Sequence, residues 1–306
     1  MENYRYILEP YKGIKTRYVC PGCNLKEFSR YIDSVSGEQI NRIVGRCNRE
    51  NNCGYHYTPK QYFQDQNIPF DNIRTRLENR SSSGFPQKPR VTFIPIEFLN
   101  KTLAKYEDNN FVKFLICLFG IEVAKQLIEK YFIGTSNHWP GATVFWQVDI
   151  NGNIRTGKIM LYSPSTGSRL KKPFNHIQWV HKVIKSPDFN LNQCLFGEHL
   201  LFKNVKPVII VESEKTAIIS SVYWPDYIWL ATGGKNNFNS NICKVLKGQK
   251  GAIYPDIGAF NDWSKIAQEI PELVNFKVSD FLELNGDNYQ LGAGDDFADY
   301  FVIHST

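Results

Sequence analysis

Apolar residues recur at two different spacings along this chain. Between residues 96 and 134 they fall at intervals of three and four, as in Phe111-x-x-Phe114 and Leu127-x-x-x-Tyr131, which predicts helices packed into a core. From residue 142 the pattern becomes that of a strand over 143–148, a turn at 149–153 and a return strand over 154–162. We therefore expect an α+β arrangement in the middle of the chain.

Strand and helix patterns alternate from residue 205 onward. Short β-branched runs predict strands over 208–211, 227–232, 252–254 and 276–278, and helical patterns lie between and after them over 213–223, 242–247, 262–270 and 295–303. Regular alternation of this kind predicts an α/β fold with a largely parallel sheet.

Composition is that of an ordinary globular protein, with 42% hydrophobic and 22% charged residues. A length of 306 residues suggests about two domains. We find no apolar run long enough to span a membrane and no apolar core of a signal peptide near Met1. We therefore expect a cytoplasmic protein with no membrane association, whose seven cysteines are not disulfide-bonded.

Charge is distributed unevenly. From Pro207 onward there are 7 Lys and Arg against 13 Asp and Glu, whereas the preceding residues carry 29 basic and 17 acidic side chains. The first 206 residues thus have a net charge of +12 and the rest −6. A basic part followed by an acidic part fits a phosphate-binding surface next to a cation site, although lopsided surfaces also occur without either.

Four of the seven cysteines lie within 34 residues, at Cys20, Cys23, Cys47 and Cys53. The C-x2-C and C-x5-C pairs, joined by a predicted hairpin over 31–40, have the spacing of a tetrahedral zinc site. His56 forms a rival C-x2-H pair with Cys53, so one ligand stays open. We predict a zinc ribbon over 1–62, and a linker over 63–91 because residues 79–89 are rich in Ser, Gly and Pro.

The ribbon also carries basic and aromatic residues, the two types that bind phosphates and stack on bases in single-stranded DNA. They are Tyr18, Phe28, Arg30, Tyr31, Arg42, Arg46 and Arg49. We expect the aromatic side chains to form the small core of the ribbon and the arginines, Arg46 among them, to contact phosphates.

Two carboxylates follow predicted strands in the C-terminal part. Glu212 comes directly after the strand over 208–211, and Asp256 follows the strand over 252–254. Strand ends at the carboxyl edge of an open α/β sheet are where such folds place their sites, so the two acids are candidates to share a divalent cation. The alternative is two solvated acids in separate loops.

These residues, with Gly233-Gly234 after the intervening strand, resemble a Toprim domain over about residues 205–304. Gln193-Cys-Leu-Phe-Gly197-Glu-His is similar to the segment that joins the basic subdomain of a bacterial primase core to its Toprim half. The ribbon is similar to the zinc ribbons of type IA topoisomerases. The resemblance implies a basic subdomain over 92–204 and a Toprim domain over 205–306, which has a Rossmann-like, mostly parallel sheet.

One departure from the Toprim pattern affects the acidic site. The second motif is usually Asp-x-Asp, and here it reads Asp256-Ile257-Gly258. Asp262 is the nearest replacement in sequence, unless it only caps a helix. The stretch from Gly294 to Asp299 resembles the segment that closes many primase-type Toprim domains, so Asp295 and Asp299 are further candidate ligands; acids in a first helical turn are also explained by the helix dipole.

The resemblance implies a primase-like DNA replication protein of a phage or mobile element that makes RNA primers by metal-dependent nucleotidyl transfer. Zn would be structural, and Mg or Mn would be bound weakly by Glu212 and Asp256 as catalytic residues. Single-stranded DNA and nucleotides would be partners, with a replicative helicase as a further candidate. A nuclease and a non-catalytic DNA-binding factor remain alternatives. Residues expected to contact phosphates are Arg46, Lys158, Arg169, Lys171, Lys172, Lys215 and Lys235.

Overall fold

The structure is a computed structural model of the whole chain, and it describes residues 4–34, 36–49, 52–66, 68, 91–186 and 189–304. The chain divides into two compact units, Met1–Pro89 and Arg90–Thr306. Most of the predicted linker over 63–91 lies outside the described residues. Among the helices of the described residues, none combines the length and apolar character needed to cross a bilayer.

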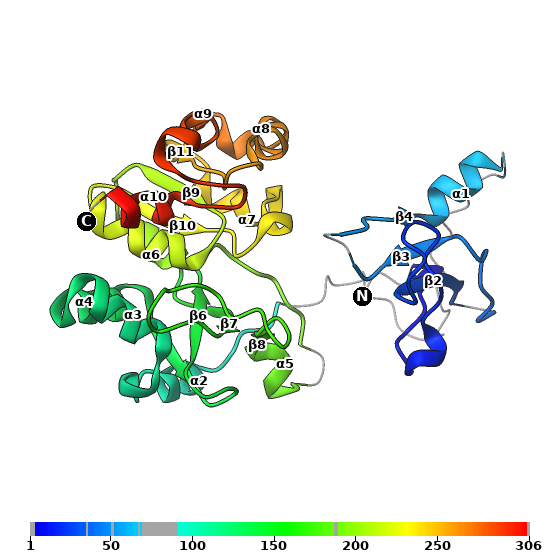
Figure 1. Cartoon of the computed structure of the whole chain (residues 1–306), viewed down its shortest axis with the longest axis horizontal. Helices are drawn as coiled ribbons and strands as arrows, with labels where there is room; N and C mark the ends of the chain where they lie inside the picture. Colours follow the sequence, from blue (N-terminus) through cyan, green and yellow to red (C-terminus); the bar gives the residue numbers. More distant parts are fainter. Residues whose placement is uncertain are drawn as a thin grey trace, which may run out of the picture. The chain divides into compact units, whose positions relative to one another are not determined.

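The first unit is built on one antiparallel sheet of order β1-β2-β3-β4 (Figure 1). Its small core contains Cys20, Phe28 and Cys47, all fully buried. A capping box at Thr58 starts helix α1, which extends past the predicted end of the ribbon at residue 62. The elements are β1 Tyr6–Leu8, a 3-10 turn Ile14–Thr16, β2 Phe28–Asp33, β3 Gly45–Cys47, β4 His56–Tyr57 and α1 Pro59–Asp65.

The second unit begins with an antiparallel sheet of order β5-β6-β7-β8, as the change of apolar period at residue 142 predicts. Strand β6 is buried along its whole length because both faces of the sheet are covered. The elements are α2 Ile96–Thr102, a 3-10 turn Tyr106–Asp108, α3 Asn110–Phe119, α4 Ile121–Tyr131, β5 Ile133–Ser136, β6 Ala142–Val148, β7 Ile154–Met160, β8 Ile177–Trp179, α5 Val180–Ile184 and a 3-10 turn Glu198–Leu201.

The C-terminal half of this unit contains a four-stranded parallel sheet of order β10-β9-β11-β12, which confirms the α/β prediction. Alternate residues of β9 face two separate cores, so apolar side chains cover both faces of the sheet. The elements are β9 Val208–Val211, α6 Glu214–Tyr223, β10 Ile228–Ala231, α7 Ser240–Cys243, β11 Gly251–Ile253, α8 Phe260–Glu269, β12 Phe276–Val278, α9 Phe281–Asn285 and α10 Phe297–His304, with 3-10 turns at Lys235–Asn237, Lys244–Leu246, Pro271–Leu273 and Asp287–Tyr289.

The two halves of the second unit share one apolar core. Phe111 and Phe145 from the first half belong to the same buried cluster as Ile209 and Trp229 from the parallel sheet. The connecting segment also pairs with the sheet, because Phe196 forms a β-bridge with Ala231. This shared packing fixes the antiparallel sheet relative to the acidic edge of the parallel sheet.

Candidate metal centres and acidic site

The four ribbon cysteines converge, as their spacing predicts. Their sulfur atoms all lie within 4.8 Å of one another, with Sγ–Sγ distances of 3.6 Å for Cys20 and Cys53 and 3.9 Å for Cys23 and Cys47. A tetrahedron with Zn–S bonds of about 2.3 Å has S–S edges of about 3.8 Å, so the donor set and the geometry fit zinc.

The clustered thiols differ in how readily they form thiolates, and burial raises the pKa of the Cys47 thiol to about 12. The backbone at Leu25 hydrogen-bonds to Cys23 and is the main cause that lowers the pKa of that thiol to about 7. A lowered pKa favours the thiolate, which is the form that binds metal. His56 does not join the cluster, since its Nε2 lies 3.0 Å from the hydroxyl of Tyr31. The ligand choice that the sequence left open is thus decided for the four cysteines and against His56.

The aromatic residues of the ribbon pack inward or against arginines. Phe28 is fully buried against Tyr55, as expected for a core residue. The guanidinium of Arg30 lies 3.9 Å from the centroid of the Tyr18 ring. Arg46 is exposed on strand β3. Stacked arginine and aromatic groups are suited to contacts with bases and phosphates.

Glu212 and Asp256 follow the C-terminal ends of two neighbouring parallel strands. Glu212 comes directly after β9, and Asp256 lies three residues beyond the end of β11, which pairs with β9. Burial raises the pKa of Asp256 to about 9, and the charges of Asp296 and Glu212 act in the same direction. Burial also raises the pKa of Glu212. The charge of Glu212 thus disfavours the ionised form of Asp256.

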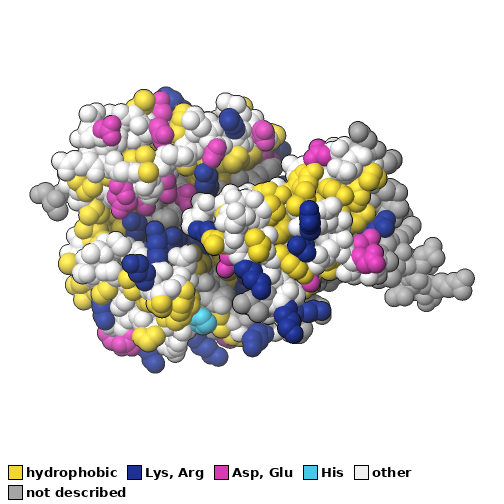
Figure 2. All heavy atoms as spheres, turned by 45° about the vertical axis from the view of Figure 1, so that its right-hand side comes forward, with side chains coloured by type: hydrophobic (Ala, Val, Ile, Leu, Met, Phe, Trp, Pro, Cys, Tyr) yellow, Lys and Arg dark blue, Asp and Glu magenta, His cyan; other side chains and the backbone are white. Residues whose placement is uncertain are grey.

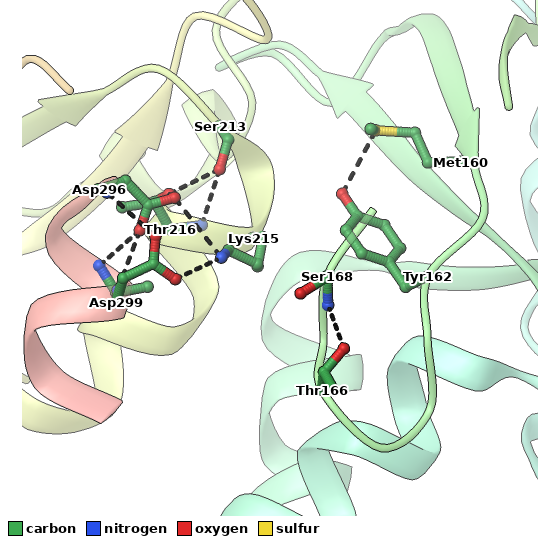
Figure 3. Close-up of polar contacts among 10 residues, drawn as sticks. Met160, Tyr162, Thr166, Ser168, Ser213, Lys215, Thr216, Asp296 and Asp299 are labelled. Atoms are coloured by element: carbon green, nitrogen blue, oxygen red, sulfur yellow. Dashed lines mark hydrogen bonds and ion pairs between the residues drawn. The ribbon is translucent and has the colours of Figure 1, made fainter. Parts of the chain in front are cut away.

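Helix α10 brings two further acids to this edge (Figure 3). Asp296 caps the helix, because its Oδ1 accepts the backbone N–H groups of Ala298 and Asp299, while Asp299 Oδ2 accepts the N–H of Asp296. The preceding loop is tied to the strand exit by two backbone hydrogen bonds, from Ile257 to Asp295 and from Gly294 to Ile257.

Lys215, in the first turn of α6, neutralises part of this acidic cluster. Its Nζ lies 3.0 Å from Oδ1 of Asp299 and 3.6 Å from Oδ2 of Asp296. Burial opposes the charged lysine, but the two aspartates outweigh it and raise the pKa of Lys215. Thr216 donates to Asp296 Oδ2 at 2.6 Å. We call Glu212, Asp256, Asp296, Asp299 and Lys215 the acidic cluster. Among the described residues, however, no three of its carboxylates lie close enough together to form a group that could hold one metal ion.

The structure places the other predicted ligands elsewhere. Asp295 accepts the backbone N–H of Gly292 in its own loop. Asp262 is exposed, forms a 2.8 Å ion pair with Lys235, and lies inside α8 rather than at its cap, because the helix starts two residues earlier than predicted. Gly258 has φ +88°, and its N–H donates to Glu283.

The predicted phosphate contacts fall into two groups. Arg169, Lys171 and Lys172 are exposed on the segment after β7. Burial raises the pKa of Glu212, and the charge of Arg169 is among the causes that partly offset this rise. Lys158 is buried instead: its Nζ contacts Glu214 Oε2 at 3.1 Å and the carbonyl of Gly233 at 2.8 Å. On the face that Figure 2 shows, Lys and Arg side chains gather beside a group of acidic ones.

Two functional candidates were missed by the sequence reasoning. Asp296 stands next to Asp295, and the Asp296-x-x-Asp299 spacing of a capping box is the signal that distinguishes the two. The sequence pattern did not mark Glu214 as a functional candidate, because an acid in the first turn of a helix is usually exposed and is stabilised by the helix dipole. Here it is 1% exposed, and one of its oxygens has no hydrogen-bond partner among the described residues.

Comparisons with known proteins find family models that match a part of each unit. The zinc beta-ribbon finger family matches residues 4–68, and a domain of unknown function (DUF6371) matches residues 109–257. No curated protein matches the chain. The first match includes all four clustered cysteines, and the second includes Glu212 and Asp256.

Two solved structures from bacteriophage T7 are similar to this chain at low identity. The primase fragment of the T7 primase-helicase protein is 15% identical, with 89% of this chain and 95% of that chain covered and a TM-score of 0.38. The other is a complex of the T7 lagging-strand DNA polymerase with primase domains of two gp4 subunits bound to an RNA/DNA hybrid and dTTP. It is 16% identical, with 54% of this chain and 82% of that chain covered and a TM-score of 0.32.

Proposed function

We propose that this chain is a primase-like replication protein that binds single-stranded DNA and joins ribonucleotides in a metal-dependent reaction. The observation that carries the proposal is the placement of Glu212 and Asp256 after the ends of neighbouring parallel strands, where the charges of Asp296 and Asp299 also act on Asp256. Strand ends of a parallel sheet are the usual place for such a site. The zinc ribbon is the proposed contact for the DNA strand.

Three carboxylates of the acidic cluster have proposed roles. Asp256 and Asp296 hold Mg²⁺ or Mn²⁺, and Asp296 supplies the carboxylate that Gly258 cannot. Glu212 is a metal ligand or accepts the proton of the attacking hydroxyl. A divalent ion bound here would neutralise the negative charge that develops on the phosphate oxygens during nucleotidyl transfer. Arg169, Lys171 and Lys172 are the exposed cations proposed to hold the template or nucleotide phosphates.

Incorporation of labelled ribonucleotides on a single-stranded DNA template, with Mg²⁺ and with Mn²⁺, tests the proposal. We expect short RNA products from the wild type and a loss of at least about a hundredfold in Glu212→Gln and Asp256→Asn, because both acids act on the reacting groups. Glu122→Gln is the matched control, since this residue is exposed on α4.

The alternative functions give different results in the same experiment. A nuclease would shorten the DNA with metal and without nucleotides. A binding factor would retain DNA but make no product in either metal. Unchanged primer synthesis in both acidic variants would reject catalysis at this site.

A further inference from the structure

A cavity outside the acidic cluster lies in the Arg90–Thr306 unit. It has a volume of about 430 Å³ and is lined by the β6–β7 turn, by the connecting segment at Asn192–Cys194 and by the region around α7. This volume is within the usual range for small-molecule sites, about 300–1,000 Å³. None of the residues of the acidic cluster lines it.

The two acids of this cavity already have partners. Asp149 accepts from the backbone N–H groups of Asn151 and Asn153 and from Arg155 Nε at 2.8 Å. The carboxylate of Glu198 accepts the N–H groups of Ile150 and Leu195. Their carboxylate oxygens already accept hydrogen bonds from the protein, so the two acids do not require a cation in the cavity.

The lining groups that remain available are hydrogen-bond donors. Arg155 uses only Nε, and within the described part of the chain its two terminal nitrogens make no hydrogen bond. Its guanidinium is held over the Phe93 ring at 5.0 Å. Gln193 Nε2 also has no partner there, but it is buried away from the open space of the cavity. The free nitrogens of Arg155 would therefore be the ones to gain a hydrogen bond from a ligand acceptor.

The rim adds a cation and amide groups. Lys244 is exposed and contacts Asn241 Oδ1 at 3.3 Å, while Asn241 donates to Asn192 at 2.8 Å. An arginine fork and a lysine recognise a phosphate group, and Asn and Gln amides recognise the edges of a base or the hydroxyls of a sugar. The available donors therefore match a small ligand rich in acceptors.

We propose that this cavity binds a nucleoside monophosphate, at a site distinct from the acidic cluster. Arg155 and Lys244 contact its phosphate, and the amides of Asn192 and Asn241 at the rim contact the base or sugar. The inference goes beyond the proposed function, because it requires neither a divalent cation nor catalysis.

Methyl NMR of the full chain locates the ligand. Ile150 and Ile242 line the cavity, whereas Ile257 follows Asp256 at the acidic cluster. AMP, GMP, CMP and UMP are titrated without added divalent metal, with nucleosides and inorganic phosphate as separate arms. We expect saturable shifts of the Ile150 and Ile242 methyl signals with a monophosphate and weaker ones with phosphate or nucleoside alone.

Three variants make the test specific. Lys244→Gln and Arg155→Gln should each weaken binding about tenfold, the effect of one lost charge-assisted hydrogen bond. Lys247→Gln, which is exposed on the same segment but does not line the cavity, should not change it. The proposal is overturned if no monophosphate shifts Ile150 or Ile242, if only Ile257 shifts, or if both variants bind like the wild type. A failure of primer synthesis alone leaves these readouts unchanged, so the two proposals fail separately.

Discussion

The ammonium group of Lys158 lies 3.1 Å from Oε2 of Glu214, and both side chains are almost fully buried. Lys158 comes from the antiparallel sheet and Glu214 from the first turn of α6, next to Lys215 of the acidic cluster. The same Nζ also donates to the carbonyl of Gly233. One buried cation thus links the two halves of the second unit beside the proposed active site.

Breaking this pair should be costly. Lys158→Met leaves Glu214 as an unpaired buried charge, and we expect the free energy of unfolding to fall by about 3–5 kcal/mol. The double variant Lys158→Met with Glu214→Leu should recover most of the loss, because no charge is left unpaired. Urea unfolding measures both. Lys125→Met, which breaks an exposed pair with Glu122, should change stability by less than about 1 kcal/mol.

Purified protein should contain one equivalent of zinc. Cys47→Ser removes a buried ligand, so we expect the zinc content to fall by at least half and the ribbon to lose its fold, as judged by metal analysis and amide NMR. Cys117→Ser is the matched control, because Cys117 is exposed and lies outside the ribbon. Full zinc content in Cys47→Ser would show that the ion is held by other ligands.

Binding to single-stranded DNA should weaken strongly with salt. About five phosphate contacts give a log–log slope near −3.5, and fluorescence anisotropy across a salt series measures it. Replacing Lys171 and Lys172 by Gln should make the slope less steep by about 1.4. Lys277→Gln, on strand β12, should leave it unchanged. A flat salt dependence would contradict the proposed phosphate contacts.

Divalent metal affinity should rise with pH. Burial raises the pKa of Asp256 to about 9, so this carboxyl is mostly protonated at neutral pH in the metal-free protein. A metal ion must displace that proton, and the affinity should increase up to about tenfold per pH unit until pH reaches about 9. Calorimetry in buffers of different ionisation enthalpy should detect the released proton. Asp256→Asn should bind more weakly and without this proton release.

Two asparagine variants separate the candidates for the missing carboxylate. Asp296→Asn should weaken metal binding at least about tenfold, because Asp296 lies in the acidic cluster, while Asn can still cap α10. Asp262→Asn should leave the affinity unchanged, since Asp262 pairs with Lys235 at the surface. Circular dichroism first checks that both variants fold, and metal titrations then compare their affinities. The reverse order of effects would assign the role to Asp262.

Local patterns in the sequence were enough to predict many of the elements. Ser213 caps α6 as predicted, with its hydroxyl accepting the N–H of Thr216, because a cap depends only on residues three apart. Runs of β-branched residues gave the strands of the parallel sheet. The spacing of the four cysteines predicted their convergence, because a ribbon hairpin brings two cysteine pairs together as the ligands of one tetrahedral metal ion.

The tertiary structure decided which charged groups lie together. Lys158 and Glu214 are 56 residues apart, and only the packing of one sheet against one helix makes them a buried pair. Asp296 and Asp295 are adjacent, yet one joins the acidic cluster and the other closes its own loop. Sequence spacing fixes the type of element, whereas burial and charge pairing depend on contacts between distant elements.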